Sequence, residues 1–148
     1  MSASTSSSSN KEIIGIRYPY PVQALTFSPT GSQTIYFSNL LRVPTSSLNR
    51  SKIFVEETVV ITGANVYSFA ATAGTDESWS MYIRVNGTTD YLVETVSAAT
   101  NERIFNNSSL NITVNAGEYF EMKMDNPPWS IPPASVVLAG NVFTSNIN

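Results

Sequence analysis

The stretch Ser78-Trp-Ser-Met-Tyr-Ile-Arg-Val85, followed directly by Asn86-Gly87, decides the fold class. Every second residue from Trp79 to Val85 is apolar, and this period of two is typical of a strand with one buried face. An Asn-Gly pair tolerates the positive φ angles of a type I′ turn, so it is a strong local signal for a β-hairpin. The partner strand is predicted over residues 91–96.

The same alternation recurs in the rest of the chain. Residues 110–114 and 120–124 each alternate, and Ala116-Gly117 between them predicts a second turn. Residues 135–139 are apolar on both faces, which predicts a central strand of a sheet. Further strands are expected at residues 13–17, 22–27, 34–37, 53–61 and 65–71.

These patterns predict an all-β protein, an antiparallel β-sandwich of jelly-roll-like form. No segment keeps a helical apolar stripe over several turns, and eight prolines disfavour helices further. We expect a flexible Ser-rich N-terminal arm over residues 1–11, one jelly-roll β-sandwich domain over 12–144 and a polar tail over 145–148.

Charge narrows the partners that the protein is expected to bind. Only 13% of its 148 residues are charged, where about 25% is usual, and the net charge is −3. The eight Lys and Arg residues form no cluster, so neither nucleic acid nor an anionic membrane is an expected partner. The chain has no apolar run of about 20 residues, no signal-peptide pattern and no cysteine. We therefore expect synthesis in the cytoplasm.

Histidine and cysteine are absent, and carboxylates, lysine and tyrosine remain as possible catalytic side chains. Without histidine there is no Ser-His-Asp or Cys-His arrangement and no His-containing metal site. Glu56 and Glu57 point to opposite faces of a predicted strand, as do Glu118 and Glu121, so neither is a promising glycosidase pair. We predict no enzyme, no catalytic residue, no metal site and no cofactor.

Three segments are candidates for contacts with a partner. Trp129 and Ile131 lie between paired prolines, and Trp129 either covers one end of the sandwich or is an exposed anchor. Arg17, Tyr18 and Tyr20 belong to a Pro-containing segment that is either an edge strand protected from further pairing or a docking strip. The arm, with Ser6 and Asn10, is either disordered or folds against a partner.

The region from Trp79 to Gly140 resembles a recurrent module of tailed-bacteriophage virion proteins. That family is similar in pattern to the jelly-roll heads of tumour-necrosis-factor-like and complement-head-like trimers. The resemblance covers roughly 60 residues well and about the preceding 60 loosely. It is carried by Tyr82-Ile-Arg-Val-Asn-Gly-Thr-Thr-Asp-Tyr-Leu-Val93, Phe105-Asn-Asn-Ser-Ser-Leu-Asn-Ile112, Val114-Asn-Ala-Gly-Glu-Tyr-Phe-Glu-Met-Lys123, Pro128-Trp129, Pro133 and Val136-Val-Leu-Ala-Gly140.

The resemblance implies a structural protein of the virion, because none of its motifs is catalytic. Fibre versions usually follow a shaft or anchoring domain, and only the Ser-rich arm precedes the module here. The expected role is therefore a cement or decoration protein on the capsid surface, which binds the major capsid protein as a homo-oligomer, a trimer rather than a dimer. The alternative is the glycan-recognising head of a tail fibre or spike. A glycan-degrading enzyme would need a carboxylate pair that the spacing does not provide.

Overall fold

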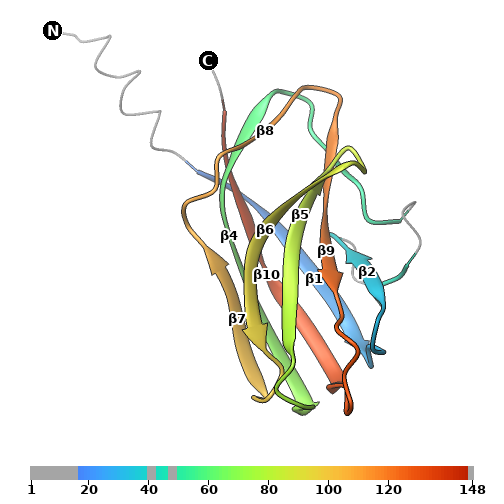
Figure 1. The fold of residues 1–148 in the computed structure, drawn as a ribbon. Helices are drawn as coiled ribbons and strands as arrows, with labels where there is room; N and C mark the ends of the chain where they lie inside the picture. Colours follow the sequence, from blue (N-terminus) through green and yellow to red (C-terminus); the bar gives the residue numbers. More distant parts are fainter. Residues whose placement is uncertain (1–16, 40–42, 47–49, 147–148) are drawn as a thin grey trace, which may run out of the picture.

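The protein is a sandwich of two antiparallel sheets (Figure 1). A computed structural model describes residues 17–39, 43–46 and 50–146. The strands in these residues are β1 (Tyr18–Phe27), β2 (Thr34–Phe37), β3 (Ile53–Phe54), β4 (Val59–Thr72), β5 (Ser78–Val85), β6 (Thr89–Ser97), β7 (Glu102–Asn107), β8 (Ile112–Val114), β9 (Tyr119–Asp125) and β10 (Ala134–Asn146).

The strand order is that of a jelly roll. Sheet A has the order β1-β10-β4-β7, with β8 also paired to β4, and sheet B has the order β2-β9-β5-β6, with β3 paired to β9. The pairs are nested along the chain: β1 with β10, β2 with β9, β4 with β7 and β8, and β5 with β6. One long hairpin rolled over itself produces this nesting, which confirms the predicted all-β, jelly-roll-like sandwich.

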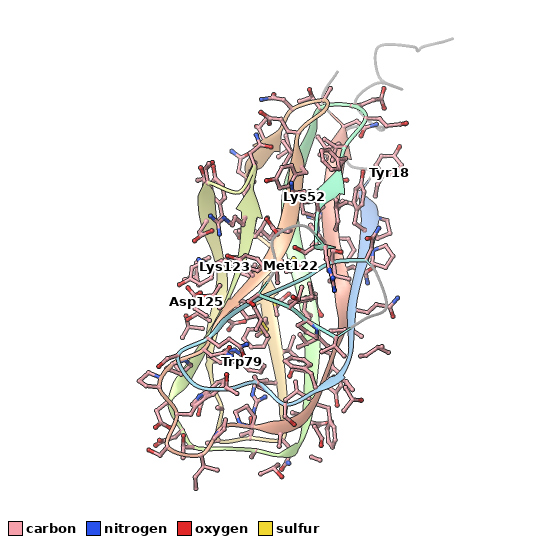
Figure 2. The ribbon with its side chains drawn as sticks, turned by 90° about the vertical axis from the view of Figure 1, so that its right-hand side faces the viewer. Tyr18, Lys52, Trp79, Met122, Lys123 and Asp125 are labelled. Atoms are coloured by element: carbon pink, nitrogen blue, oxygen red, sulfur yellow. The ribbon has the colours of Figure 1, made fainter. Side chains whose placement is uncertain are left out.

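The predicted hairpin is present. Asn86 and Gly87 have φ angles of 52° and 67°, as a type I′ turn requires, and they connect β5 to β6. The apolar residues of β5 are fully or largely buried, with Trp79, Met81 and Ile83 at 0% exposure. Figure 2 shows Trp79 inside the sandwich, with Met122 of β9 also between the sheets. The alternation in the sequence therefore identified the core face of sheet B correctly.

Two predictions about strand boundaries were wrong. The expected strand over residues 53–61 is divided into β3 and the start of β4, because the turn before β9 holds the chain after Phe54. Val55 N donates to Glu118 O at 3.0 Å, and Gly117 N donates to Val55 O at 2.8 Å. The expected separate strand at residues 65–71 instead continues the 14-residue β4.

The last strand is longer than expected. It was predicted over residues 135–139, and β10 extends to Asn146 because each residue from Thr144 onward pairs with β4. Ser145 and Asn146 therefore belong to the sandwich and not to a polar tail. As predicted, β10 is central, with β1 on one side and β4 on the other. The predicted strand at residues 13–17 lies outside the described residues apart from Arg17, which precedes β1.

The open edges of the sandwich are closed by specific contacts. Gln23 N in β1 donates to Ser38 O beyond β2 at 2.9 Å, which joins the two sheets. Backbone N–H directions alternate along a strand, so the nitrogens of Pro19 and Pro21 point to the same side of β1 as that of Gln23. A proline nitrogen carries no hydrogen, so these two positions cannot donate to a further strand. At the other edge, Asn107 Nδ2 in β7 donates to Val93 O in β6 at 3.1 Å. The prolines of β1 therefore limit edge pairing, as one of the two interpretations predicted.

Candidate docking surface

The outward face of sheet A is almost free of charge. Glu102 and Arg103 are the only charged residues in its five strands, and Arg103 is buried on the inner side. Tyr67 Oη donates to Glu102 Oε2 at 2.7 Å, and this hydrogen bond raises the pKa of Tyr67. Depletion of charge is a feature of the centres of protein interfaces. This face is therefore the candidate docking surface.

Exposed apolar side chains gather on this face. The register aligns Ala139 of β10 with Tyr67 of β4 and Ile104 of β7, and Val137 lies beside Phe69 in the next row. Tyr67, Phe69 and Ile104 are 37%, 39% and 53% exposed. We call these five residues the sheet-A patch. Contiguous exposed apolar residues on a sheet are typical of a surface that contacts another molecule.

A pocket of about 250 Å³ lies at the end of the patch that is nearer the start of β4. Its floor includes a cross-strand row of three asparagines, Asn141, Asn65 and Asn106, which is the row next to Ala139, Tyr67 and Ile104. Asn65 Nδ2 donates to Asn106 Oδ1 at 3.0 Å, so these two amides hold each other in a fixed orientation. The remaining polar side chains of the lining are those of Asn107, Ser108 and Arg17.

Small residues leave the space for this pocket. Gly63 and Ala64 are part of its lining, and the pairing of β10 with β4 shifts register beside Gly63, between Phe143 and Thr144. Phe143 is the one aromatic residue in the lining. Among the residues that the structure describes, no carboxylate lines the pocket, and Arg17 is its one charged side chain.

The outward face of sheet B differs from that of sheet A because it carries charges of both signs. Lys123 Nζ lies 2.5 Å from Asp90 Oδ2 and 3.6 Å from Asp125 Oδ2, and Arg84 Nε lies 3.7 Å from Asp90 Oδ1. Figure 2 shows Lys123 and Asp125 together along β9. Burial by itself lowers the pKa of Lys123, but the hydrogen bond to Asp90 and the charges of Asp125 and Asp90 raise it overall. Such a mutually neutralised cluster is typical of a solvated face.

One carboxylate on sheet B is fully buried. Glu121 is 0% exposed although its position in β9 predicts an outward side chain, and Ser51 Oγ donates to its Oε1 at 2.5 Å. The second oxygen, Oε2, has no hydrogen-bond partner among the described residues. Burial raises the pKa of Glu121, and the hydrogen bond from Ser51 and the charges of Arg84 and Lys52 oppose this effect. The segment containing Ser51 thus covers this part of sheet B.

Trp129 covers the end of the sandwich, and Ile131 does not. Trp129 is 7% exposed, and its Nε1 donates to Glu77 O at 3.3 Å. Its ring packs against Trp79. The alternative of Trp129 as an exposed anchor is therefore wrong, because the indole is already buried against the core. Ile131, two residues later, is 58% exposed and remains available for contacts.

The candidate residues near the N-terminus have different environments. Tyr18 is 45% exposed, whereas Tyr20 is half-buried and packs edge-to-face on Phe120 at 5.6 Å. Arg17 is exposed and lines the pocket. Ser6 and Asn10 lie outside the described residues.

Sequence reasoning missed the sheet-A patch and the asparagine row. A signal was available: β4 and β10 contain no charged residue, and both combine apolar and amide side chains. The pattern does not reveal which strands are neighbours, however. Tyr67 and Ile104 are far apart in the sequence and meet only through the register of β4 and β7.

The described residues contain no group of three or more His, Cys, Asp or Glu side chains that could hold a metal ion. In the same residues, no helix has the length and apolar character needed to cross a membrane. A scan against protein-family models and a search of curated proteins found no match to this chain.

Proposed function

We propose that this protein is a non-enzymatic structural protein of a bacteriophage virion, a cement or decoration protein that binds the outside of the capsid through the sheet-A patch. In this role it stabilises contacts between subunits of the major capsid protein. The jelly-roll fold supports the proposal, together with the resemblance of residues 79–140 to virion modules. The observation that carries it is the outward face of sheet A, where Glu102 is the one charged side chain and Tyr67, Phe69 and Ile104 are exposed side by side.

Weak contacts at a single copy can add up to strong binding on a symmetric shell. The sheet-A patch is apolar and lies on paired strands, so burying it requires little ordering of the backbone. Glu102 is already hydrogen-bonded to Tyr67, so its carboxylate has a partner when water is removed. When many copies bind neighbouring capsid subunits, modest contacts combine into a large total effect.

The same proposal includes a homo-oligomer, with a trimer favoured over a dimer. A closed symmetric assembly would present several sheet-A patches to the shell at once. Light scattering coupled to size-exclusion chromatography, run over a range of protein concentrations, measures the mass of the species in solution. A trimer is the expected result, and a monomer at every concentration contradicts this part of the proposal.

The second candidate function is the glycan-recognising head of a tail fibre or spike. Exposed aromatic rings commonly stack on sugar faces, and Trp129, Tyr18 and Tyr20 are the aromatic residues among the candidate contacts. Trp129 is buried and Tyr20 is half-buried, so of these three only Tyr18 is well exposed. The number of copies in purified particles separates the two functions. Quantitative mass spectrometry relative to the major capsid protein should give a ratio typical of the capsid surface. A ratio typical of a tail component would favour the second candidate.

The decisive experiment adds purified protein to bacteriophage particles that lack it. Ile104→Glu places a charge in the centre of the sheet-A patch and should abolish binding to particles. Leu92→Glu is the matched control, because Leu92 is a similarly exposed aliphatic residue, at 49%, on a strand of the other sheet. Normal binding by Leu92→Glu with loss by Ile104→Glu supports docking through sheet A. Equal binding by both variants overturns it.

A further inference from the structure

The pocket beside the sheet-A patch offers several unused hydrogen-bond donors. Asn65 Nδ2 donates to Asn106 Oδ1, so Asn106 Nδ2 is oriented by this pair and makes no hydrogen bond of its own among the described residues. The side-chain amide of Asn141, the third member of the row, has no partner among these residues either. These donors and the guanidinium of Arg17 line the same small cavity.

The charge of the pocket distinguishes it from the rest of the protein. The whole chain has a net charge of −3, but the described residues that line the pocket include one cation and no acid. The nearest acid on the same sheet face, Glu102, lies two register rows beyond Asn65 and is held by Tyr67. Glu94 of the other sheet accepts a hydrogen bond from the backbone N of Asn106 at 2.7 Å, but it does not line the pocket. A carboxylate entering the pocket would therefore meet a guanidinium and amide N–H groups, with no described carboxylate in the lining.

Size and position indicate what kind of carboxylate fits. A volume of about 250 Å³ is below the roughly 300–1,000 Å³ of sites for drug-sized ligands, so it suits one short side chain. Asn65, Asn106 and Asn141 each lie two residues along a strand from a member of the sheet-A patch. The pocket and the patch thus form one continuous surface, which favours a protein partner over a free saccharide.

We propose that this pocket binds an acidic side chain, Glu or Asp, of the protein on which the sheet-A patch docks. Arg17 pairs with the carboxylate, the amides of Asn106 and Asn141 donate to it, and Phe143 packs on its methylene groups. This inference rests on the proposed function, and it adds the chemical feature that the partner must present. The patch provides the apolar contact area, and the pocket fixes the position in which the partner docks on it.

The first test uses the isolated protein and small probes. N-acetyl-glutamate methylamide, its glutamine analogue and glucuronate are titrated separately, and NMR follows the side-chain amide signals of Asn106 and Asn141. The glutamate probe should shift these signals and should bind at least about five-fold more tightly than the glutamine analogue. Equal binding of the two amino-acid probes overturns the proposal. Preferential binding of glucuronate also overturns it, in favour of a saccharide site.

Variants test whether the named groups carry the preference. Arg17→Gln should abolish the preference for glutamate, and Asn141→Ala should weaken binding of the glutamate probe about five-fold. Arg50→Gln is the matched control, because Arg50 is an exposed arginine outside the pocket. Arg17 and Asn141 are not part of the buried core, so circular dichroism should show the same fold for all three variants. A preference that survives Arg17→Gln overturns the assignment.

Binding to particles separates this inference from the proposed function. Arg17→Gln should lower affinity for particles that lack the protein about ten-fold, whereas Ile104→Glu should abolish binding. If Ile104→Glu abolishes binding and Arg17→Gln has no effect, the pocket assignment is wrong while docking through sheet A stands. If neither variant affects binding to particles, the proposed docking surface itself is wrong.

Discussion

The indole rings of Trp79 and Trp129 meet edge to face, with ring centroids 5.5 Å apart and an interplanar angle of 77°. Trp79 belongs to β5, and Trp129 belongs to the segment between β9 and β10. Trp79 Nε1 donates to Asn126 Oδ1 at 2.6 Å, so both indole N–H groups have acceptors. This contact fastens the connection between two strands of different sheets onto the core.

Replacing Trp129 should strongly destabilise the fold. Trp129→Ala removes a large ring that is 7% exposed and leaves a cavity beside Trp79, so the free energy of unfolding should fall by about 3–5 kcal/mol. Urea denaturation followed by far-UV circular dichroism measures the change. Ile131→Ala, in the same segment but 58% exposed, should remain within about 0.5 kcal/mol of the wild type. Similar losses for the two variants would contradict the role assigned to Trp129.

A buried arginine should be irreplaceable by lysine. Arg103 has no acidic partner in the described part of the chain. Its Nε donates to Ser97 O at 3.1 Å, and its Nη2 donates to the carbonyls of Ala73, Ala98 and Thr100. Burial lowers the pKa of Arg103. Lysine has one terminal nitrogen and cannot span these carbonyls, so Arg103→Lys should lower the free energy of unfolding by about 1.5–3 kcal/mol.

Hydrogen exchange provides a local measurement for the same variant. Arg103→Lys should speed exchange in residues 97–101, which contribute three of the four carbonyls. Arg50→Ala removes an exposed arginine and should leave both exchange and stability unchanged within about 0.5 kcal/mol. Unchanged exchange in Arg103→Lys would show that the carbonyl contacts do not hold this turn.

Glu121 should make stability depend on pH in an unusual direction. Because its pKa is raised in the folded state, the folded protein binds this proton more tightly than the unfolded chain does. The resulting stabilisation is present below the unfolded pKa of about 4.5 and is lost as the pH rises through the folded pKa. Glu121→Gln removes this loss, so the free energy of unfolding of the variant relative to the wild type should increase from about pH 4 to about pH 8.

Glu118 supplies a control of opposite sign for that measurement. The backbone N–H of Asn115 donates to Glu118 Oε1 at 2.8 Å and lowers the pKa of Glu118, with a further contribution from Asn86. Its stabilisation is therefore present above the unfolded pKa and is lost as the pH falls. Glu118→Gln should lose stability relative to the wild type as the pH rises, by urea denaturation over the same range. If the free energies of unfolding of Glu121→Gln and Glu118→Gln, each relative to the wild type, changed with pH in the same direction, the burial effect at Glu121 would be ruled out.

The close approach of β10 and β4 should make Gly140 intolerant of any side chain. A Cβ atom at Gly140 would lie 2.0 Å from Asn65 O and 2.6 Å from Val66 Cα, both of which are backbone atoms of the paired strand. Gly140→Ala should therefore lower the free energy of unfolding by about 3 kcal/mol, at the upper end of overpacking effects. Thermal and urea denaturation measure the loss. Ala139→Ser, at the exposed neighbouring position, is the control and should change stability by less than about 0.5 kcal/mol.

Local patterns in the sequence were sufficient for the fold class and for most of the core. Alternation in β5 and β9 identified Trp79, Met81 and Met122 as buried, and the Asn86-Gly87 pair identified the hairpin. These predictions held because a period of two reflects the strand geometry of each segment alone. The division of residues 53–61 could not be predicted, because it depends on backbone hydrogen bonds that Val55 makes far along the chain, donating to Glu118 O and accepting from Gly117 N.

The environments of several single residues also depended on distant parts of the chain. Strand parity predicts that Glu121 faces solvent, but the segment containing Ser51 covers it. Trp129 had two possible roles in the sequence, and its burial follows from its contact with Trp79, fifty positions earlier. The odd or even position of a residue in a strand predicts which face of the sheet its side chain lies on. It does not predict which other segment of the chain packs over that face.

The sequence by itself determined an all-β sandwich with few charges and without the histidines that most catalytic sites use. Those conclusions follow from composition and from short-range periodicity, which the chain carries before it folds. Only the tertiary structure decided where the uncharged surface and its pocket lie. Tyr67 meets Ile104, and Asn65 meets Asn106 and Asn141, because the jelly-roll order places β4 between β10 and β7. Strand order arises from long-range pairing, so the candidate docking surface appears only when the sheets are assembled.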